Sequence, residues 1–220
     1  DPVSPALQPP AALTKQAWKD AVLTSTGGTV LHPDGSISVW DEKRPNAVQR
    51  LDLHAAAIAS SGDDVFMLDA KGGVVRLRDS KIVAEGLRAI FSFSQAGTLP
   101  ALTSDENLVW LEIDSGTRKP LPKPPGAILR LAMLEGETLG CLLQSGDLLI
   151  LEGSAFVKSS DASKHRAADL HAGDGFTLMV DENGRCMLSG IKIPNSPQRF
   201  RLPENAKNIR VGPLGRLVAW

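Results

Sequence analysis

Short apolar segments alternate with polar turns along most of the chain. One pattern recurs: a corner of small residues, an apolar segment, a polar turn and a second apolar segment. The apolar segments are rich in β-branched, aliphatic and aromatic residues, which is typical of strands. The five copies span residues 25–41, 61–79, 96–114, 135–153 and 172–190. The pattern therefore predicts five β-hairpins.

The hairpin turns recur at a nearly constant interval. Gly or Asn marks each turn, at Gly35, Gly73, Asn107, Gly146 and Gly184, and the separations are 38, 34, 39 and 38 positions. Gly and Asn accept the positive φ that a two-residue primed hairpin turn requires. Self-similarity at a fixed period indicates a repeat architecture.

Each hairpin is flanked by two further strand candidates. Those before the hairpins are residues 21–25, 56–60, 89–94, 128–133 and 168–172. More polar ones follow the hairpins at residues 48–53, 82–84, 118–121, 155–158 and 199–202. Four strands in a repeat of about 37 residues predict a blade of a β-propeller, which is an all-β fold. Only residues 11–20, after Pro10, have a helical composition.

The two ends of the chain predict a sixth blade. The last fourteen residues align with the first two strands of the preceding repeat, so that Ile209 falls on Leu170 and Leu217 on Leu178. Residues 4–10 resemble the outer-strand segment 196–203. We therefore expect a six-bladed propeller whose last blade combines residues 207–220 with an N-terminal strand, because such closure removes exposed sheet edges. No third strand of this blade is apparent.

The expected domain organisation follows from these ends. Residues 1–16 are expected to be a Pro-rich linker that includes the closing strand, and residues 17–220 a single propeller domain. Four prolines in the first ten residues resemble an interdomain linker, so we expect the propeller to be part of a larger protein.

Composition narrows the classes of partner. The net charge is −1, from 24 Lys and Arg against 25 Asp and Glu, which disfavours nucleic-acid binding as the main role. The hydrophobic fraction of 42% argues against disorder, and the apolar runs are too short for a membrane-spanning helix. Cys141 and Cys186 form no CxxC pair, and we expect two buried thiols rather than a disulfide.

Two of the repeats carry a family resemblance. STGGTVLHPDGSISVWD (25–41) and AGDGFTLMVDENGRCMLSG (172–190) resemble repeats of the regulator of chromosome condensation family, although Trp is kept only at Trp40 and Trp110. Val39-Trp40-Asp41 gives a second resemblance, to WD-repeat propellers. Neither family has one function. The resemblance therefore implies a platform for binding rather than a chemistry.

Motifs for catalysis and metal binding are weak. His165, Asp169, His171 and Asp174 lie in one stretch, and Zn²⁺ accepts both ligand types, but ordinary loop and strand residues are the favoured interpretation. The acidic turns Asp34-Gly35, Asp63-Asp64 and Asp181-Glu182 lack the DxDxDG spacing of a calcium loop. No nucleophile, phosphate-loop or HExxH motif is present. We therefore expect no catalytic, cofactor-binding or metal-binding residues and no cofactor.

Two other features have a functional and a structural interpretation, and the structural one is favoured for both. A third feature, a basic cluster, has a structural interpretation only. The Pro-rich segment 118–125 fits a polyproline ligand or a rigid loop between blades. Trp40 and Trp110 fit a stacking surface or packing between blades. The basic cluster of Arg199, Arg201, Lys207 and Arg210 fits the solvated face of an outer strand.

The function that we expect is a non-catalytic interaction or sensing domain that contacts protein partners through a loop-rich propeller face, without nucleic acid as its main role and without membrane insertion. The alternative is an extracytoplasmic propeller that binds a small ligand or a glycan. A third candidate, an enzyme with its site over the central channel, would show carboxylates or histidines with perturbed pKa values around that channel.

Overall fold

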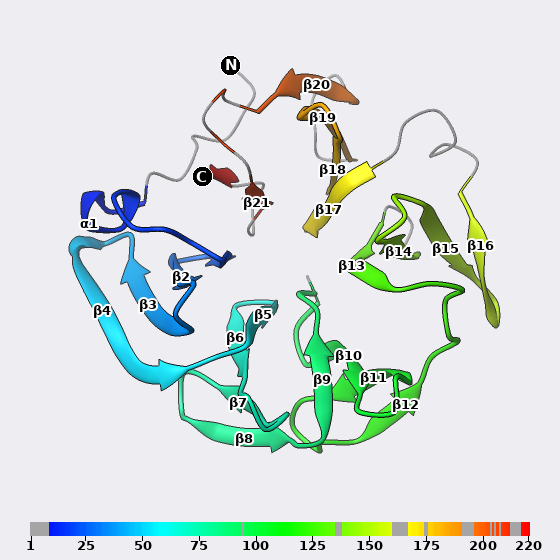
Figure 1. Ribbon diagram of the computed structural model, residues 1–220, viewed down its shortest axis with the longest axis horizontal. Coiled ribbons are helices and arrows are strands. Elements are labelled where there is room, and N and C mark those ends of the chain that lie inside the picture. Colours follow the sequence, from blue (N-terminus) through cyan, green and yellow to red (C-terminus); the bar gives the residue numbers. More distant parts are fainter. Residues whose placement is uncertain are drawn as a thin grey trace.

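The computed structural model is a ring of antiparallel sheets around a central channel (Figure 1). It describes residues 9–93, 95–134, 138–159, 167–173, 176–190, 196–202, 204, 206, 208–211 and 217–220. Five of the sheets have four strands and one has two. In the five larger sheets the strands follow one another in sequence order from the channel to the rim, which is the architecture of a β-propeller.

The blades are numbered in chain order. Blade 1 comprises β1 (Asp20–Thr24), β2 (Gly27–Leu31), β3 (Ser36–Asp41) and β4 (Arg44–His54). Blade 2 comprises β5 (Ala57–Ser61), β6 (Asp64–Leu68), β7 (Val74–Arg76) and β8 (Lys81–Ala84). Blade 3 comprises β9 (Leu87–Ile90), β10 (Thr98–Thr103), β11 (Leu108–Glu112) and β12 (Arg118–Pro120).

The remaining elements follow the same order. Blade 4 comprises β13 (Ile128–Met133), β14 (Leu139–Leu143), β15 (Leu148–Glu152) and β16 (Ala155–Lys158). Blade 5 comprises β17 (Ala167–Gly173), β18 (Phe176–Asp181), β19 (Arg185–Gly190) and β20 (Gln198–Arg201). The sixth unit comprises β21 (Ile209–Val211) and β22 (Leu217–Ala219), and the short helix α1 (Ala11–Thr14) precedes blade 1.

The predicted number of blades is wrong. The described residues form five four-stranded blades instead of six, because those of the sixth repeat form only the two-stranded sheet β21–β22. Its alignment with the first two strands of blade 5 is confirmed, since β21 takes an innermost position in contact with both β1 and β17.

The N-terminal segment meets the sixth unit through apolar packing. Residues 1–8, which carry most of the predicted closing strand, lie outside the described residues. The following residues form helix α1, in keeping with helix-forming Ala and Leu after Pro10. Leu13 of α1 is fully buried and packs in one cluster with Trp40 of blade 1 and Val218 of β22. The proposed division at residue 16 stays a prediction.

The hairpin turns differ from the prediction. The residues with positive φ in the five turns are Gly35, Gly72, Glu106, Gly146 and Gly184. In blade 2, Gly72 N–H donates to the Asp69 carbonyl oxygen at 3.2 Å, and Asp69 N–H donates to the Gly73 carbonyl oxygen at 2.8 Å. These are four-residue turns closed by a left-handed residue rather than two-residue primed turns. The predicted Gly73 and Asn107 therefore follow the positive-φ residue by one position.

The core lies between neighbouring blades and includes Trp40 and Trp110. Trp40 packs between blade 1 and the sixth unit, where Trp18 and Trp220 also lie. Trp110 packs its ring edge to face against Phe93, with ring centroids 4.7 Å apart, in a cluster that continues into blade 4. The expected packing of Trp40 and Trp110 between blades is confirmed.

The Pro-rich segment is built into the connection between blades 3 and 4. Arg118–Pro120 forms strand β12, and Leu121 N–H donates to the Leu108 carbonyl oxygen at 2.9 Å. Pro124 is buried, and Lys119 pairs with Glu112. The segment therefore has the structural role of a rigid connection.

Both thiols are free and buried, as expected. Burial raises the pKa of Cys141 to about 12. Burial and the nearby Asp181 carboxylate raise the pKa of Cys186 to about 11. Neither thiol is therefore a thiolate at neutral pH.

We expect the native protein to resist thiol reagents. Ellman's reagent should label neither cysteine at pH 8 in buffer and both in denaturant, because thiolate formation requires exposure. The Cys186→Ser variant, which retains Cys141, tells the two sites apart. Rapid labelling of the folded wild type would contradict this description of the thiols.

Candidate functional site

The innermost parts of all six units line a cavity of about 130 Å³ in the central channel. Its apolar walls include Ile58 and Phe91, while its polar groups come mainly from blades 1, 4 and 5 and from the sixth unit. Innermost strands from distant parts of the sequence meet here because the ring brings them together. The cavity is therefore the place where polar side chains of several blades converge.

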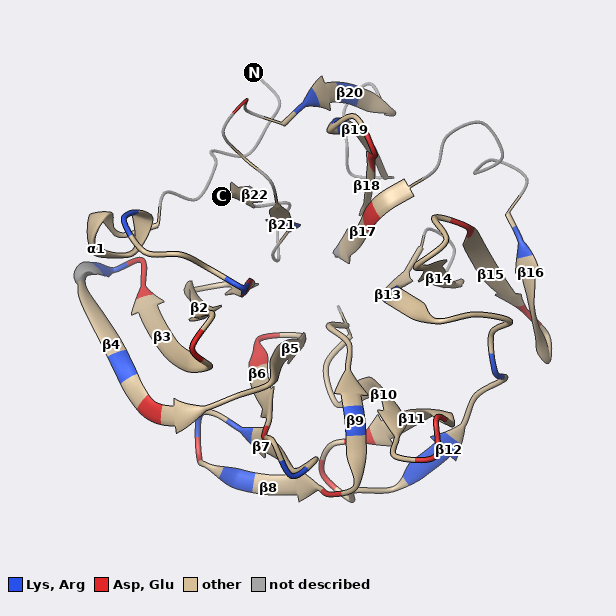
Figure 2. Ribbon diagram, in the orientation of Figure 1, with Lys and Arg blue, Asp and Glu red and all other residues tan. Residues whose placement is uncertain are grey.

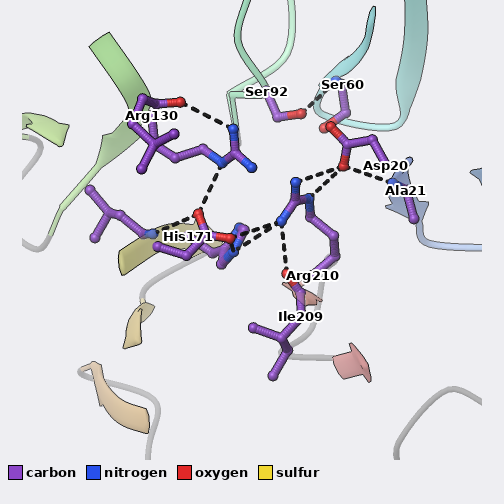
Figure 3. A network of polar contacts seen from close by, with 11 residues as sticks. Asp20, Ala21, Ser60, Ser92, Arg130, His171, Ile209 and Arg210 are labelled. Atoms are coloured by element: carbon purple, nitrogen blue, oxygen red, sulfur yellow. Dashed lines mark hydrogen bonds and ion pairs between the residues drawn. The ribbon is translucent and has the colours of Figure 1, made fainter. Parts of the chain in front are cut away.

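Asp169 is the centre of a network of polar contacts with Arg130, His171 and Arg210. These three partners line the cavity (Figure 3). Asp169 Oδ1 accepts a hydrogen bond from Arg130 Nε at 2.9 Å, and Asp169 Oδ2 accepts one from Arg210 Nη1 at 3.1 Å. His171 Nε2 lies 3.0 Å from the same Oδ2. Asp169 and His171 reach the same side because residues two apart in a strand share a face. The carboxylate thus joins blades 4 and 5 to the sixth unit.

Arg210 extends the network to blade 1. Its Nε and Nη2 donate to Asp20 Oδ1 at 2.8 and 2.7 Å. Its Nη1 also donates to the Ile209 carbonyl oxygen, and its guanidinium lies 5.5 Å from the centre of the Trp220 ring. Arg210 is the middle residue of the three-residue strand β21. One side chain therefore ties the smallest sheet to both neighbouring blades.

The buried network shifts two pKa values in the same direction. Burial alone raises the pKa of the Asp169 carboxyl, but His171, Arg130 and Arg210 outweigh it and hold that pKa well below its usual range. Burial lowers the pKa of His171, and Arg210 and Arg130 lower it further against the opposing effect of Asp169. At neutral pH Asp169 is therefore ionised and His171 is neutral.

A neutral His171 fixes the hydrogen bonding around it. Its Nε2–H donates to Asp169, so the approach of Arg210 Nη1 to the same nitrogen at 3.4 Å joins two donors and is not a hydrogen bond. The two arginines and two aspartates of the network have a net charge of zero. The charges of the network therefore neutralise one another.

The candidate metal ligands do not form a metal site in the described part of the chain. His165 and Asp174 lie outside the described residues, while Asp169 is bound to Arg130 and Arg210, and His171 is bound to Asp169. Among the described residues, no three His, Cys, Asp or Glu side chains cluster as metal ligands would. Two guanidinium groups beside Asp169 oppose the approach of a cation.

The acidic turns use their carboxylates to order the backbone. Asp34 Oδ1 accepts from Ser36 N–H at 3.0 Å, and Asp181 Oδ1 accepts from Arg185 N–H at 2.9 Å. Asp63 Oδ1 accepts from Ser25 N–H of blade 1 at 2.7 Å. These contacts agree with the interpretation that the acidic residues serve the turns and not a cation.

Sequence reasoning missed Asp20, Arg130 and Arg210 as members of the network. The prediction that Arg210 lies on the solvated face of an outer strand is wrong, because β21 lies on the channel. A signal was present: Arg130, Asp169 and Arg210 are separated by 39 and 41 positions, about one repeat each, and alternate in sign. Opposite charges one repeat apart on innermost strands predict ion pairs between adjacent blades.

The buried histidine gives an expected dependence of stability on pH. Below about pH 6.5 the unfolded chain protonates His171 and the folded chain does not, so the free energy of unfolding should fall as the pH falls from 7.5 to 5.5. The lowered pKa of Asp169 adds a further loss below about pH 4. Urea unfolding at each pH measures both. The His171→Gln variant should flatten the first region, whereas His54→Gln, at an exposed position, should not.

Solved structures share this fold at low sequence identity. Prp20p from Saccharomyces cerevisiae superposes with a TM-score of 0.62 at 14% identity, over 91% of this chain and 67% of that chain. The Cps50 (Swd1) β-propeller domain from Myceliophteria thermophila gives a TM-score of 0.63 at 13% identity, over 93% and 80% of the two chains. Human WBSCR16 gives 0.60 at 11%, over 91% and 71%.

Comparisons of sequence give no relative: no protein-family model matches the chain, and no curated protein sequence matches it significantly. The structural likeness extends to RCC1 (Prp20) and to a WD40 ectodomain, the two kinds of propeller that the repeats resemble. The chain is therefore an all-β propeller of four-stranded antiparallel blades, with a fold like that of the RCC1 and WD40 propellers.

Proposed function

We propose that this chain is a non-catalytic propeller domain that binds protein partners. The observation that carries the proposal is the self-neutralised network in the channel, where Asp169, Arg210 and Asp20 bind one another. Such a network stabilises the ring and leaves the outer surfaces of the blades for recognition. A ring of packed blades is rigid, so its surfaces are preorganised for a partner.

The pKa shifts in the channel argue against acid–base catalysis. The perturbed groups that the enzyme hypothesis requires are present, in Asp169 and His171. However, a general acid or base works best with a pKa near the operating pH, and both pKa values are moved away from neutrality. His171 is also buried and occupied by Asp169, so a substrate would have to break that contact to reach it.

Two of the similar structures are described with protein partners: Prp20p with Gsp1p and histones, and yeast RCC1 with Kap60. These partners belong to those proteins and support only the class of function proposed here. Among the described residues, no helix is long and apolar enough to cross a membrane.

A second candidate function, binding of a small ligand in the channel, has one observation in its favour. Arg130 donates from Nε to Asp169 and from Nη1 to the Leu129 carbonyl oxygen, whereas its Nη2 has no hydrogen-bond partner within the described part of the chain. Arg130 also lines the cavity. Under the ligand- or glycan-binding alternative, this guanidinium group would bind the ligand.

Proximity labelling followed by reconstitution separates the two functions. The chain fused to a biotin ligase identifies neighbours, and each neighbour is then titrated with the purified chain by calorimetry. We expect saturable binding of at least one protein with defined stoichiometry, and no thermal shift from a panel of glycans and metabolites. Absence of any reconstituted complex, together with stabilisation by a small molecule that the Arg130→Ala variant loses, would establish the ligand-binding function instead.

A further inference from the structure

Three arginines lie on one side of blade 5 around a pair of methionines. In the register of the sheet, Met179 pairs with Met187 and Met187 with Arg199, while Arg185 pairs with Arg201. Paired residues point to the same face of a sheet, so these five side chains share the face turned toward blade 4. Figure 2 shows the positive charge on β20 at the rim of the ring.

The three arginines have no ion-pair partner among the residues that the structure describes. Arg185, Arg199 and Arg201 are exposed, and no acidic side chain in the described part of the chain forms an ion pair with them. The neighbouring Asp181 carboxylate is occupied by backbone N–H groups of its own turn. Like charges directly opposite in a sheet are destabilising, so the Arg185–Arg201 pair costs stability in the isolated chain.

The same side chains line a groove of about 370 Å³. Met179 and Met187 are both half-buried in it, and Met179 also packs toward blade 4. Met is an adaptable apolar contact, and Met and Arg are both enriched in protein interfaces. The groove, which Asp181 also lines, thus combines an apolar floor with three arginines.

We propose that this groove, the arginine groove of Met179, Arg185, Met187, Arg199 and Arg201, binds an acidic, extended segment of a partner protein. The inference rests on the proposed protein-binding function and names the chemistry of the partner. Carboxylates of the segment pair with the arginines, which removes their mutual repulsion, and an apolar side chain lies on the two methionines.

The spacing of the arginines fits an extended segment. Arg199 and Arg201 are alternate residues of β20, so they point to the same face about 7 Å apart along the strand. Acidic residues at alternate positions of an extended peptide have the same separation. Arg fits this role because its planar guanidinium binds a carboxylate with two parallel hydrogen bonds.

The proposal predicts opposite effects on folding and on binding. The Arg185→Glu variant places a carboxylate opposite Arg201, so its melting temperature should rise slightly while peptide affinity falls at least tenfold. A merely solvated basic surface would give the stability change without any loss of binding.

The test uses fluorescence anisotropy with a labelled twelve-residue peptide that alternates Glu and Ser around one central Leu. The full-length chain should bind it saturably at low salt, and less tightly as salt rises. The triple variant Arg185→Gln/Arg199→Gln/Arg201→Gln should lose at least tenfold in affinity. The control Lys43→Gln/Lys71→Gln/Lys123→Gln changes the net charge equally at exposed positions and should bind like the wild type.

Several outcomes overturn the proposal. The first is that the peptide does not bind, and the second is that the two triple variants bind it with equal affinity. The third is that heparin or single-stranded RNA binds more tightly than the peptide, and that replacing the peptide Leu with Ser does not lower the peptide's affinity. A reconstituted protein partner that binds the arginine variant normally would refute the arginine groove and leave the proposed function intact. Peptide binding in the absence of any such partner would leave the groove intact and count against the proposed function.

Discussion

Replacing Arg210 with Met is expected to lower the free energy of unfolding by about 3–5 kcal/mol, because removal of one partner leaves buried charges uncompensated. The exposed fractions are 12% for the Arg210 side chain and 15% for Asp169, so water replaces little of the lost interaction. Asp20 loses its ion pair in the same variant. Met keeps most of the side-chain volume, and the loss therefore reports on charge rather than on a cavity.

Urea unfolding of Arg210→Met and Arg50→Met gives a matched comparison. Arg50 pairs with Asp34 in blade 1, but both side chains are more than half exposed, at 63% and 58%, so its loss should cost less than about 1 kcal/mol. If the two variants lose similar stability, the network in the channel does not hold the ring together. Hydrogen exchange should show the Arg210 effect first in β1, β17 and β21.

Replacing Trp40 with Ala is expected to cost about 3–5 kcal/mol, since a large buried aromatic side chain is removed from a packed core. Only 3% of Trp40 is exposed, and it shares a cluster with Leu13 of α1 and Val218 of β22. The N-terminal helix and the C-terminal strand therefore lose a common contact. Opposite Trp40 is Gly28, where an added Cβ would lie 2.2 Å from the indole ring.

Thermal and urea unfolding measure the Trp40 effect, and Trp40→Phe is the control because it keeps an aromatic ring at the site. The expected order of stability is wild type, then Trp40→Phe, then Trp40→Ala. A loss of under 1 kcal/mol in Trp40→Ala would contradict the assignment of this cluster to ring closure.

The strands were predictable because their signal is local. Apolar β-formers recur in segments such as Ser36–Asp41 and Leu108–Glu112, and polar turns separate them. The number of complete blades was not predictable in this way. The alignment of the last fourteen residues with the preceding repeat identifies the two inner strands of the sixth unit, and it gives no information on outer strands. The turn type was missed because Gly72 and Gly73 are adjacent, and composition does not say which has positive φ.

The channel network was hidden for a different reason. Asp169 and His171 are neighbours in sequence and were noticed, but their partners Arg130 and Arg210 each lie about one repeat away. Only the closed ring brings these residues together. A basic residue between apolar neighbours, as at Arg210, has the same local pattern on an innermost strand as on an outer one.

The two sets of charges have different roles. Those in the channel pair with each other and close the ring. Arg185, Arg199 and Arg201 of the arginine groove lie at the rim and have no ion pair with any described residue. This separation means that a channel variant and a surface variant should affect different properties of the protein.

The most direct test of the central claim, that the chain binds proteins without using its channel as an active site, is calorimetric titration of a reconstituted partner with the wild type and with His171→Gln. We expect the same affinity and stoichiometry for both, because His171 is buried within the network. Loss of partner binding in His171→Gln while the variant stays folded, or a turnover in the wild type that this variant abolishes, would contradict the claim.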